Sequence, residues 1–408
     1  MLSTKTIEIV KSTAPVLAEK GLEITSHFYK RLFENHPELL NIFNHANQKQ
    51  GRQQTALANT IYAAATYIDQ LEVLLPAVKQ IAYKHRSLGV KPEHYPIVGE
   101  HLLLAIKEVL GEVASDEIIQ AWGAAYGVIS QVFIDVENEM YAEAKNQPYG
   151  WEGFKKFVVV KKQQENNLIT SLYLEPMDKT AVPSFQPGQY ITIRLNIPGE
   201  TYLVNRQYSL SNAPGEKYYR ISVKREANNS TPNGKVSNYL HDLLVMGNEL
   251  DVSAPSGDFY LNEESSAPIY LISGGIGVTP MMSMLNYLKE KQPSREITFI
   301  HAAQNGDVHA FKEEKAKLFS ELENAHQSLF YNQPTEEDKK HDGFIEGRIQ
   351  MDWIKTNIRN KNAHFYICGP IPFMRAMIDS LERIGVYDEN IHYEFFGPSI
   401  NLKEYQNV

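Results

Sequence analysis

A single histidine occupies a position where a helix should carry an apolar side chain. In the segment IAYKHRSLGV, Ile81, His85 and Leu88 fall on one face of a 3.6-residue repeat. Pro76 suits the first turn of that helix, and Gly89 suits its end. An imidazole that points into an apolar interior is either a core residue with a satisfied hydrogen bond or a metal ligand. The segment by itself leaves both interpretations open.

A second group of residues has the chemistry to bind a flavin. The segment RQYSLSN begins at Arg206, whose planar guanidinium can donate paired hydrogen bonds to a pyrophosphate. Tyr208 could lie along the isoalloxazine ring, and Ser209 could place a hydroxyl near flavin N5. Tyr190, in the earlier segment PGQY, suits an adenine or ring contact. The alternative is an ordinary strand that carries a solvated arginine.

Two short glycine-containing turns each follow an apolar strand pattern. SGGIGVTP (273–280) leads into a helical segment, so a pyrophosphate could approach backbone N–H groups there. CGP (368–370) follows a later strand. Either motif alone is compatible with a tight turn, but at the carboxyl edge of one sheet the two together predict a nucleotide site. The residues of the first turn predicted to contact the nucleotide are Gly275, Ile276, Gly277, Val278, Thr279 and Pro280.

The composition is that of an ordinary globular protein. The 408 residues carry a net charge of −9, which argues against a nucleic-acid partner. The lone cysteine, Cys368, cannot form an internal disulfide, so we expect a reducing cytoplasm. No apolar run approaches the roughly 20 residues that a membrane span requires, and the N-terminal segment lacks the pattern of a signal peptide.

The patterning along the chain predicts three domains of different class. Residues 152–262 consist of short β-rich runs separated by turns, which is typical of an antiparallel β-barrel. Residues 266–408 alternate strands with helices, which predicts an α/β domain with a parallel sheet. Residues 1–145 carry apolar side chains at helical spacing, which predicts helices over 7–17, 22–33, 56–68, 76–88, 97–110 and 117–140.

Residues 152–408 resemble the ferredoxin-reductase-like family in the order and content of their motifs. The resemblance rests on Arg206-Gln207-Tyr208-Ser209, on SGGIGVTP, on CGP and on the terminal YEFFGP. It implies an FAD-binding barrel followed by a domain that binds NADH or NADPH, with hydride transfer from the nicotinamide to flavin N5. The C-terminal residues that it assigns to cofactor binding are Phe395, Phe396, Gly397 and Pro398.

Residues 1–145 resemble a globin. The segments that carry the resemblance are HFYKRLF, NIFNHANQ, QQTALAN and YKHRS. It implies that His85 is the proximal ligand of a haem b iron, for which a neutral imidazole is well suited. It also implies that Phe43 wedges the haem and that Leu57 lines the distal pocket.

The same resemblance assigns roles to polar residues around the haem. Tyr29, with Gln53 as helper, is the expected hydrogen-bond donor to bound O2, because that ligand gains superoxide character. Tyr95 and Glu137 form a proximal pair, in which the carboxylate would strengthen His85 as a donor to iron. Lys84 and Glu394 are family positions near the domain junction, although each could equally be an exposed charge.

A globin fused to an FAD/NAD(P) reductase resembles the flavohaemoglobins over essentially the whole chain. This resemblance implies a nitric oxide dioxygenase, in which NAD(P)H reduces FAD, FAD reduces the haem, and haem-bound O2 oxidises NO to nitrate. We expect the protein to be a monomer. Two alternatives need only part of the chain: a flavin-dependent reductase of quinones or ferric chelates, and an oxygen-binding or sensing globin. Relatives often have a cysteine where this chain has Phe395, so the resemblance does not fix the flavin potential.

Overall fold

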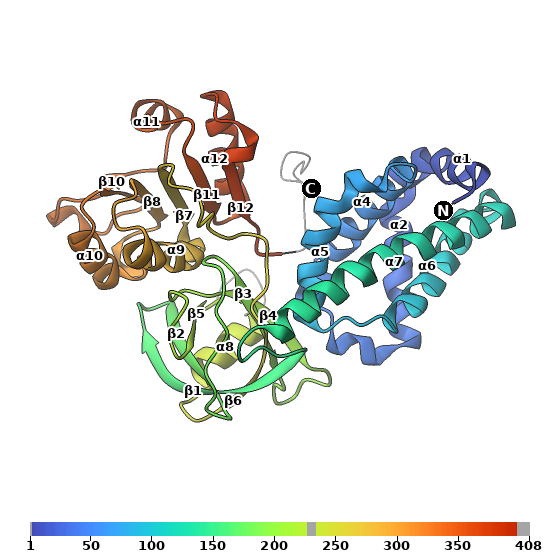
Figure 1. The fold of residues 1–408 in the computed structure, drawn as a ribbon, viewed down its shortest axis with the longest axis horizontal. Coiled ribbons are helices and arrows are strands. Elements are labelled where there is room, and N and C mark those ends of the chain that lie inside the picture. The colour runs from blue at the N-terminus through green and yellow to red at the C-terminus, as the bar shows by residue number, and fades with distance from the viewer. Residues whose placement is uncertain (1, 227–233, 398–408) are drawn as a thin grey trace. The chain divides into compact units, whose positions relative to one another are not determined.

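The computed structural model divides the chain into two compact units (Figure 1). It describes residues 2–226 and 234–397, so the predicted cofactor residue Pro398 lies outside the described residues. The first unit comprises residues 2–155 together with 192–206 and Gly397, and the second comprises the other described residues. Across these described ranges, we find no helix that is both long enough and apolar enough to span a membrane.

Residues 2–146 form helices joined by short turns, which confirms the all-α prediction for this part of the chain (Figure 1). Their core is a continuous apolar cluster in which Phe28 and Leu32 pack with Leu102 and Trp122. The helices bury these side chains because each has apolar residues along one face only. The helices are α1 (Thr4–Ser12), α2 (Ala14–Asn35), α3 (His45–Lys49), α4 (Arg52–Thr66), α5 (Leu75–Leu88), α6 (His94–Leu110) and α7 (Asp116–Asn146).

The predicted helix over residues 7–17 is wrong in its bounds, because the chain breaks at Thr13. The Thr13 hydroxyl donates to the carbonyl oxygen of Val10 at 2.6 Å and so ends α1. Pro15 lies in the first turn of α2, where its missing N–H leaves no intrahelical bond unmade. The apolar repeat runs through this break and could not reveal it.

The segment after α7 forms a six-stranded antiparallel sheet, as predicted. Its strand order is β4-β3-β6-β1-β2-β5. Leu210, just after β4, pairs with Ile221 of β5, so the two ends of this order meet and the sheet closes on itself. The strands are β1 (Phe154–Gln164), β2 (Ile169–Pro176), β3 (Tyr190–Leu195), β4 (Val204–Ser209), β5 (Tyr219–Lys224) and β6 (Glu249–Ser253), and helix α8 spans Lys235–Asp242.

The C-terminal part is a parallel six-stranded sheet in the order β10-β9-β8-β7-β11-β12, which confirms the α/β prediction. Leu271 points into the core beneath helices α9 and α10, whereas its neighbour Ile272 points beneath α11 and α12. Helices therefore cover both faces of the sheet (Figure 1). The elements are β7 (Ile269–Gly274), α9 (Val278–Lys291), β8 (Ile297–Ala303), α10 (Lys312–Glu321), β9 (Ala325–Tyr331), β10 (Ile345–Glu346), α11 (Met351–Asn357), β11 (His364–Cys368), α12 (Ile371–Arg383) and β12 (Ile391–Glu394).

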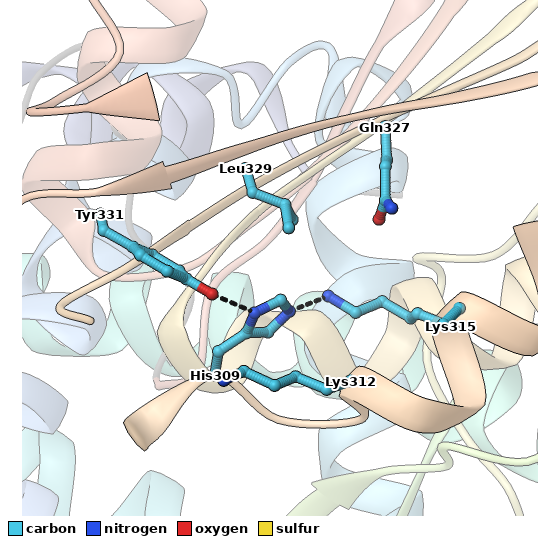
Figure 2. Close-up of a pocket in the computed structure, with 7 residues that line it drawn as sticks. His309, Lys312, Lys315, Gln327, Leu329 and Tyr331 are labelled. Atoms are coloured by element: carbon cyan, nitrogen blue, oxygen red, sulfur yellow. Dashed lines mark hydrogen bonds between the residues drawn. The ribbon is translucent and has the colours of Figure 1, made fainter. Parts of the chain in front are cut away.

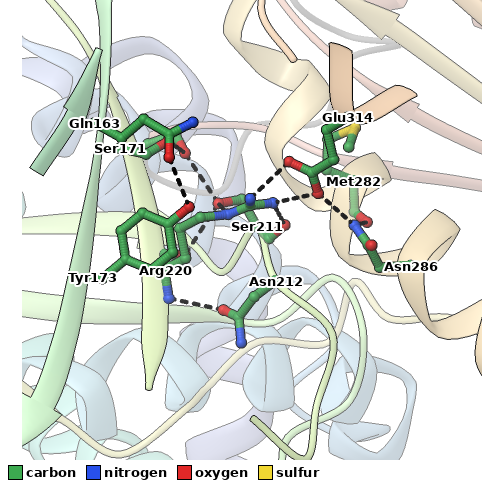
Figure 3. A network of polar contacts seen from close by, with 10 residues as sticks. Gln163, Ser171, Tyr173, Ser211, Asn212, Arg220, Met282, Asn286 and Glu314 are labelled. Carbon is green, nitrogen blue, oxygen red and sulfur yellow. Dashed lines mark hydrogen bonds and ion pairs between the residues drawn. The ribbon is translucent and has the colours of Figure 1, made fainter. Parts of the chain in front are cut away.

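A buried ion pair joins the barrel to the parallel-sheet domain within the second unit (Figure 3). The Arg220 guanidinium, on β5, donates to both carboxylate oxygens of Glu314, on α10, at 2.7 and 3.0 Å. Its Nε also donates to the hydroxyl oxygen of Ser211 and its Nη2 to the carbonyl oxygen of Ser211, so each of the three guanidinium nitrogens has an acceptor. Burial lowers the pKa of Arg220, but the hydrogen bonds and charge of Glu314 outweigh it and raise that pKa above its ordinary value.

We expect the Glu314→Gln variant to lose about 2–3 kcal/mol of unfolding free energy, because the buried Arg220 would keep its charge without a counterion. This expected loss of unfolding free energy is smaller than that for a fully buried pair, because the Glu314 side chain is 30% exposed. Glu337 pairs with Lys340 on the surface and is the matched control, for which Glu337→Gln should cost under about 1 kcal/mol. Urea unfolding of both variants measures the difference, and equal losses would contradict a special role for the pair.

Candidate haem and nucleotide sites

Helix α5 holds His85 on its inner face, as the sequence predicts. Pro76 lies in the first turn of α5, and Gly89 ends the helix in the left-handed region at φ 80°. The hydroxyl of Tyr141 donates to the carbonyl oxygen of Val90 at 2.7 Å, which ties the end of α5 to α7. The orientation of His85 is therefore fixed by both ends of its helix.

The structure brings together the three residues predicted for the proximal side. His85 Nδ1 lies 2.7 Å from Oε1 of Glu137, and the Tyr95 hydroxyl donates to the same oxygen at 2.5 Å. Because an ionised carboxylate only accepts hydrogen bonds, His85 donates from Nδ1 and keeps a lone pair on Nε2. Burial, and after it the charge of Glu137, raises the pKa of Tyr95 above its ordinary value and keeps the phenol neutral.

The predicted distal residues lie on helices α2 and α4 and in the turn between them. Tyr29 is 8% exposed, and its ring lies edge-on to Phe43 with centroids 5.8 Å apart. Leu57 packs against the same core, one helical turn after Gln53. Burial raises the pKa of the Tyr29 phenol, so that the hydroxyl keeps its proton. Oε1 of Gln53 is buried and has no hydrogen-bond partner among the described residues.

These residues fit a haem. The His85 side chain is 33% exposed although it lies on the inner face of its helix, and Nε2 has no protein partner in the described part of the chain. A neutral imidazole with Nδ1 bound to a carboxylate and Nε2 available is the donor arrangement that iron requires. The half-buried side chains of Phe43 and Leu57 provide an apolar surface, and the orphaned Gln53 oxygen lies on the helix that carries Leu57.

The residues predicted to bind the flavin follow one another along β4. Arg206, Gln207 and Tyr208 are half-buried, whereas Ser209 is buried. Nη1 of Arg206 donates to the carbonyl oxygen of Asn205 at 2.7 Å. Tyr190 begins β3 and is 6% exposed, so most of its ring already contacts protein. This burial leaves little of the Tyr190 ring to meet a ligand, while the half-buried run retains accessible groups.

The two glycine-containing turns meet at the carboxyl edge of the parallel sheet, as predicted. Ser273 of β7 pairs with Cys368 of β11, so the turns that follow the two strands start side by side. An added Cβ at Gly277 would overlap the carbonyl group of Cys368, so only glycine permits this approach. Gly275 has φ 55° and open space around its Cβ position, so a ligand could reach the backbone there. Ile276 is half-buried, and Val278, Thr279 and Pro280 are buried at the start of α9.

The remaining predicted residues lie at the end of the chain and on α5. The backbone of Glu394 on β12 lies opposite that of Cys368 on β11 in the parallel sheet. Phe395 packs against the core of the parallel-sheet domain, whereas Phe396 is 45% exposed. Nζ of Lys84 donates to the carbonyl oxygen of Gly397 at 2.6 Å, so Lys84 is not simply a solvated charge.

Two further aromatic residues, which were not predicted from the sequence, position the proximal group. The Tyr126 hydroxyl donates to the carbonyl oxygen of Tyr95 at 2.6 Å and so fixes the start of α6. Phe133 stacks beside Tyr95 with centroids 6.3 Å apart. A signal was available, because Tyr126, Phe133, Glu137 and Tyr141 follow one another on α7 at steps of seven, four and four, which is one helical face.

Comparison with sequence families divides the chain in the same order. Residues 26–133 match the globin family. Residues 156–260 match the oxidoreductase FAD-binding domain, and residues 271–379 match the oxidoreductase NAD-binding domain. The three matches fall within the ranges 1–145, 152–262 and 266–408 that we predict as domains.

A flavohemoprotein of Bacillus cereus is 59% identical over 404 residues, which is 99% of this chain and 100% of the relative. The chain belongs to the flavohemoprotein family. A flavohemoprotein of Bacillus subtilis is 51% identical over 407 residues, again 99% of this chain and 100% of the relative.

Two solved structures are similar to this flavohemoprotein. A flavohemoglobin of Malassezia yamatoensis, solved with bound FAD and heme, has a TM-score of 0.85 at 30% identity and covers 97% of this chain and 100% of its own. The flavohem-like FAD/NAD-binding domain of a nitric oxide dioxygenase from Vibrio cholerae has a TM-score of 0.55 at 38% identity. It covers 60% of this chain and 99% of its own.

Proposed function

We propose that this flavohemoprotein is an NAD(P)H-dependent nitric oxide dioxygenase that converts NO and O2 to nitrate. Two NO and two O2 give two nitrates, and one hydride from NAD(P)H supplies the two electrons that the two cycles need. The observation that carries the proposal is the hydrogen bond from His85 to Glu137 in a chain that also has a nucleotide-binding sheet edge. The similarity to the Vibrio cholerae protein, which is named as a nitric oxide dioxygenase, supports the same activity.

When bound, FAD takes up a hydride and releases electrons singly, and the haem iron takes one electron at a time and binds O2. The half-buried run of Arg206, Gln207 and Tyr208 would hold the FAD, and the turn around Gly275 would hold the nicotinamide dinucleotide. The Malassezia yamatoensis relative, which has bound FAD and heme, supports this cofactor set.

The protein's part on the proximal side is to hold a proton. Glu137 is 2% exposed and keeps that proton on Nδ1 of His85, so Nε2 stays available as the iron ligand. A carboxylate in this position also makes the imidazole a stronger electron donor. Tyr95 shares the same carboxylate oxygen and so fixes the orientation of Glu137.

The protein's part on the distal side is to aim a donor into an apolar pocket. Tyr29 remains protonated because burial raises its pKa, and the aromatic rings of Phe33 and Phe43 exclude water around it. A preorganised donor in such surroundings stabilises developing negative charge more strongly than water does. Gln53 is the second group that could donate there.

We also infer that the protein is a monomer and acts in the cytoplasm. The single cysteine, Cys368, is buried and forms no disulfide, which suits a reducing compartment. The small molecules that it would meet there are NO, O2 and NAD(P)H.

The test of the proposed function is NADH oxidation by the purified protein in air, with and without NO. We expect absorption bands of both haem and flavin, and a rate of NADH oxidation that rises sharply when NO is added. A rate that ignores NO but responds to quinones or ferric chelates would favour a plain flavin reductase instead. A protein that binds O2 but oxidises no NADH would favour an oxygen-binding globin.

The Tyr29→Phe variant removes the distal hydroxyl and keeps the ring packed against Phe43. We expect O2 to dissociate from the reduced variant about tenfold faster, because removing a donor to developing charge costs up to about 10²–10³-fold and only part of a charge develops here. Stopped-flow measurement of O2 dissociation gives the rate, with Tyr62→Phe, an exposed tyrosine on α4, as a control of the same chemistry that should leave the rate unchanged. An unchanged rate in Tyr29→Phe would leave Tyr29 with a packing role alone.

A further inference from the structure

A pocket of about 150 Å³ opens between α10 and β9 in the parallel-sheet domain (Figure 2). Lys312 and Lys315 line it from α10, and Gln327 and Tyr331 line it from β9. The His309 ring lies between the side chains of Lys315 and Tyr331 (Figure 2). Among the described residues that line this pocket, none is acidic. None of its residues belongs to the cofactor sites assigned above.

The Lys315 ammonium is the unusual group in this pocket. The residue is 1% exposed, and Nζ donates to Nε2 of His309. The ring of Phe299 lies 5.2 Å from Nζ, and in the described part of the chain no carboxylate forms an ion pair with it. A buried cation without a counterion is costly, and burial together with the charge of Lys312 lowers the pKa of Lys315 to about 7.

The described groups in contact with Lys315 do not supply the missing negative charge. Burial and the two lysines lower the pKa of His309 to about 2, so its ring is neutral. His301, on β8, is held neutral in the same way and contacts Ser273 Oγ through Nδ1 at 2.8 Å. The neighbouring carboxylate, Glu314, is bound to Arg220 instead. The Asp338 carboxylate faces Lys312 and Tyr331 and accepts from the N–H groups of Gly306 and Thr335. Among the described residues, the titratable groups in contact with Lys315 itself are neutral.

The hydrogen bonds around His309 direct a further donor into the pocket. Because the Lys315 ammonium donates to Nε2, the neutral ring carries its proton on Nδ1. Nδ1 then donates to the Tyr331 oxygen, which lies 2.7 Å away. The Tyr331 hydrogen is left for another acceptor, so this chain of bonds ends in a donor.

We propose that the pocket binds a small tetrahedral oxyanion, a phosphate or sulfate group. Lys315 and Lys312 would provide the positive charge, and the hydroxyl of Tyr331 and the amide of Gln327 would provide neutral donors. The oxyanion supplies the counterion that Lys315 lacks within the protein. It is either a free inorganic anion or a phosphate group carried by a nucleotide.

The test is equilibrium dialysis of the full-length protein against radiolabelled sulfate, an anion whose charge does not change between pH 6 and 9. At pH 6.5 we expect one saturable equivalent in the unmodified protein and none in Lys315→Met. The Lys312→Ala variant should bind several-fold more weakly. Lys317→Ala, an exposed lysine on the same helix, should bind like the unmodified protein. Absence of saturable binding, or equal binding by Lys315→Met, would overturn the proposal.

Two further measurements separate a binding role from a structural one. Lys315 is charged below its pKa of about 7, so sulfate should bind about tenfold more weakly at pH 8.5 than at pH 6.5. Lys315→Met should remain folded and at least as stable without sulfate, because methionine of similar volume removes an unpaired buried charge. A destabilised variant, or pH-independent binding, would contradict the proposal.

Repeating the dialysis with saturating NADH identifies the source of the anion. Unchanged sulfate binding supports a free inorganic anion, and competition supports a phosphate group of the nucleotide.

Discussion

The His85→Ala variant is expected to lose its haem while it keeps its FAD. Alanine removes the nitrogen that we propose as the iron ligand. The other residues of the proximal group, Tyr95 and Glu137, have no imidazole nitrogen that could replace it. Glu137 would lose one donor and keep the Tyr95 hydroxyl at 2.5 Å, so the unfolding free energy should fall by about 1–3 kcal/mol beyond the loss of haem stabilisation. The Soret absorbance relative to the flavin band measures the retained haem.

His27→Ala is the matched control for this experiment, because His27 is a half-exposed histidine of the same helical part that pairs with Glu108. It should retain a normal Soret band. A His85→Gly variant should regain haem absorbance when imidazole is added, since the small molecule can occupy the vacated position. If His85→Ala kept an unchanged Soret band, another residue would have to be the ligand.

The Gly277→Ala variant is expected to slow FAD reduction by NADH about 10²-fold, because small displacements of a positioned reactant can cost that much. The added methyl group overlaps the carbonyl group of Cys368, so the two turns at the edge of the sheet must separate. The haem spectrum should not change, since no residue of the haem site lies in these turns. Anaerobic stopped-flow absorbance at the flavin band gives the rate and its dependence on NADH concentration.

Gly127→Ala is the control for this substitution, because its added Cβ would meet nothing within 4 Å. It should reduce FAD at the unmodified rate. A normal rate in Gly277→Ala would show that the close approach of the two turns does not position the nucleotide.

The elements that could be predicted from the sequence are those in which a residue type has a single conformational consequence. Pro76 and Gly89 bound a helix because proline lacks an N–H and glycine accepts positive φ, and the apolar repeat between them then fixed the direction of His85. The strand-turn-helix patterns around Gly275 and Pro370 placed both turns at the carboxyl edge of the sheet, because parallel strands share that edge.

Other elements depended on contacts distant in sequence. Strand β6 is only five residues long, and strand β9 has polar residues at both exposed and half-buried positions. Neither strand therefore shows an alternation of apolar and polar residues clear enough to predict it from the sequence. The ion pair of Arg220 with Glu314 joins residues 94 positions apart, which no local pattern can predict. The burial of Lys315 was equally hidden, because a lysine on a helix is usually a surface residue.

The ratio of nitrate formed to NADH consumed, measured by anion chromatography and absorbance as limiting NO is added in air, tests the proposed function most directly. Each NADH gives up two electrons and each turnover uses one, so we predict two nitrates per NADH and one nitrate per NO. Nitrite or nitrous oxide as the main product, or NADH oxidised without nitrate, would contradict it.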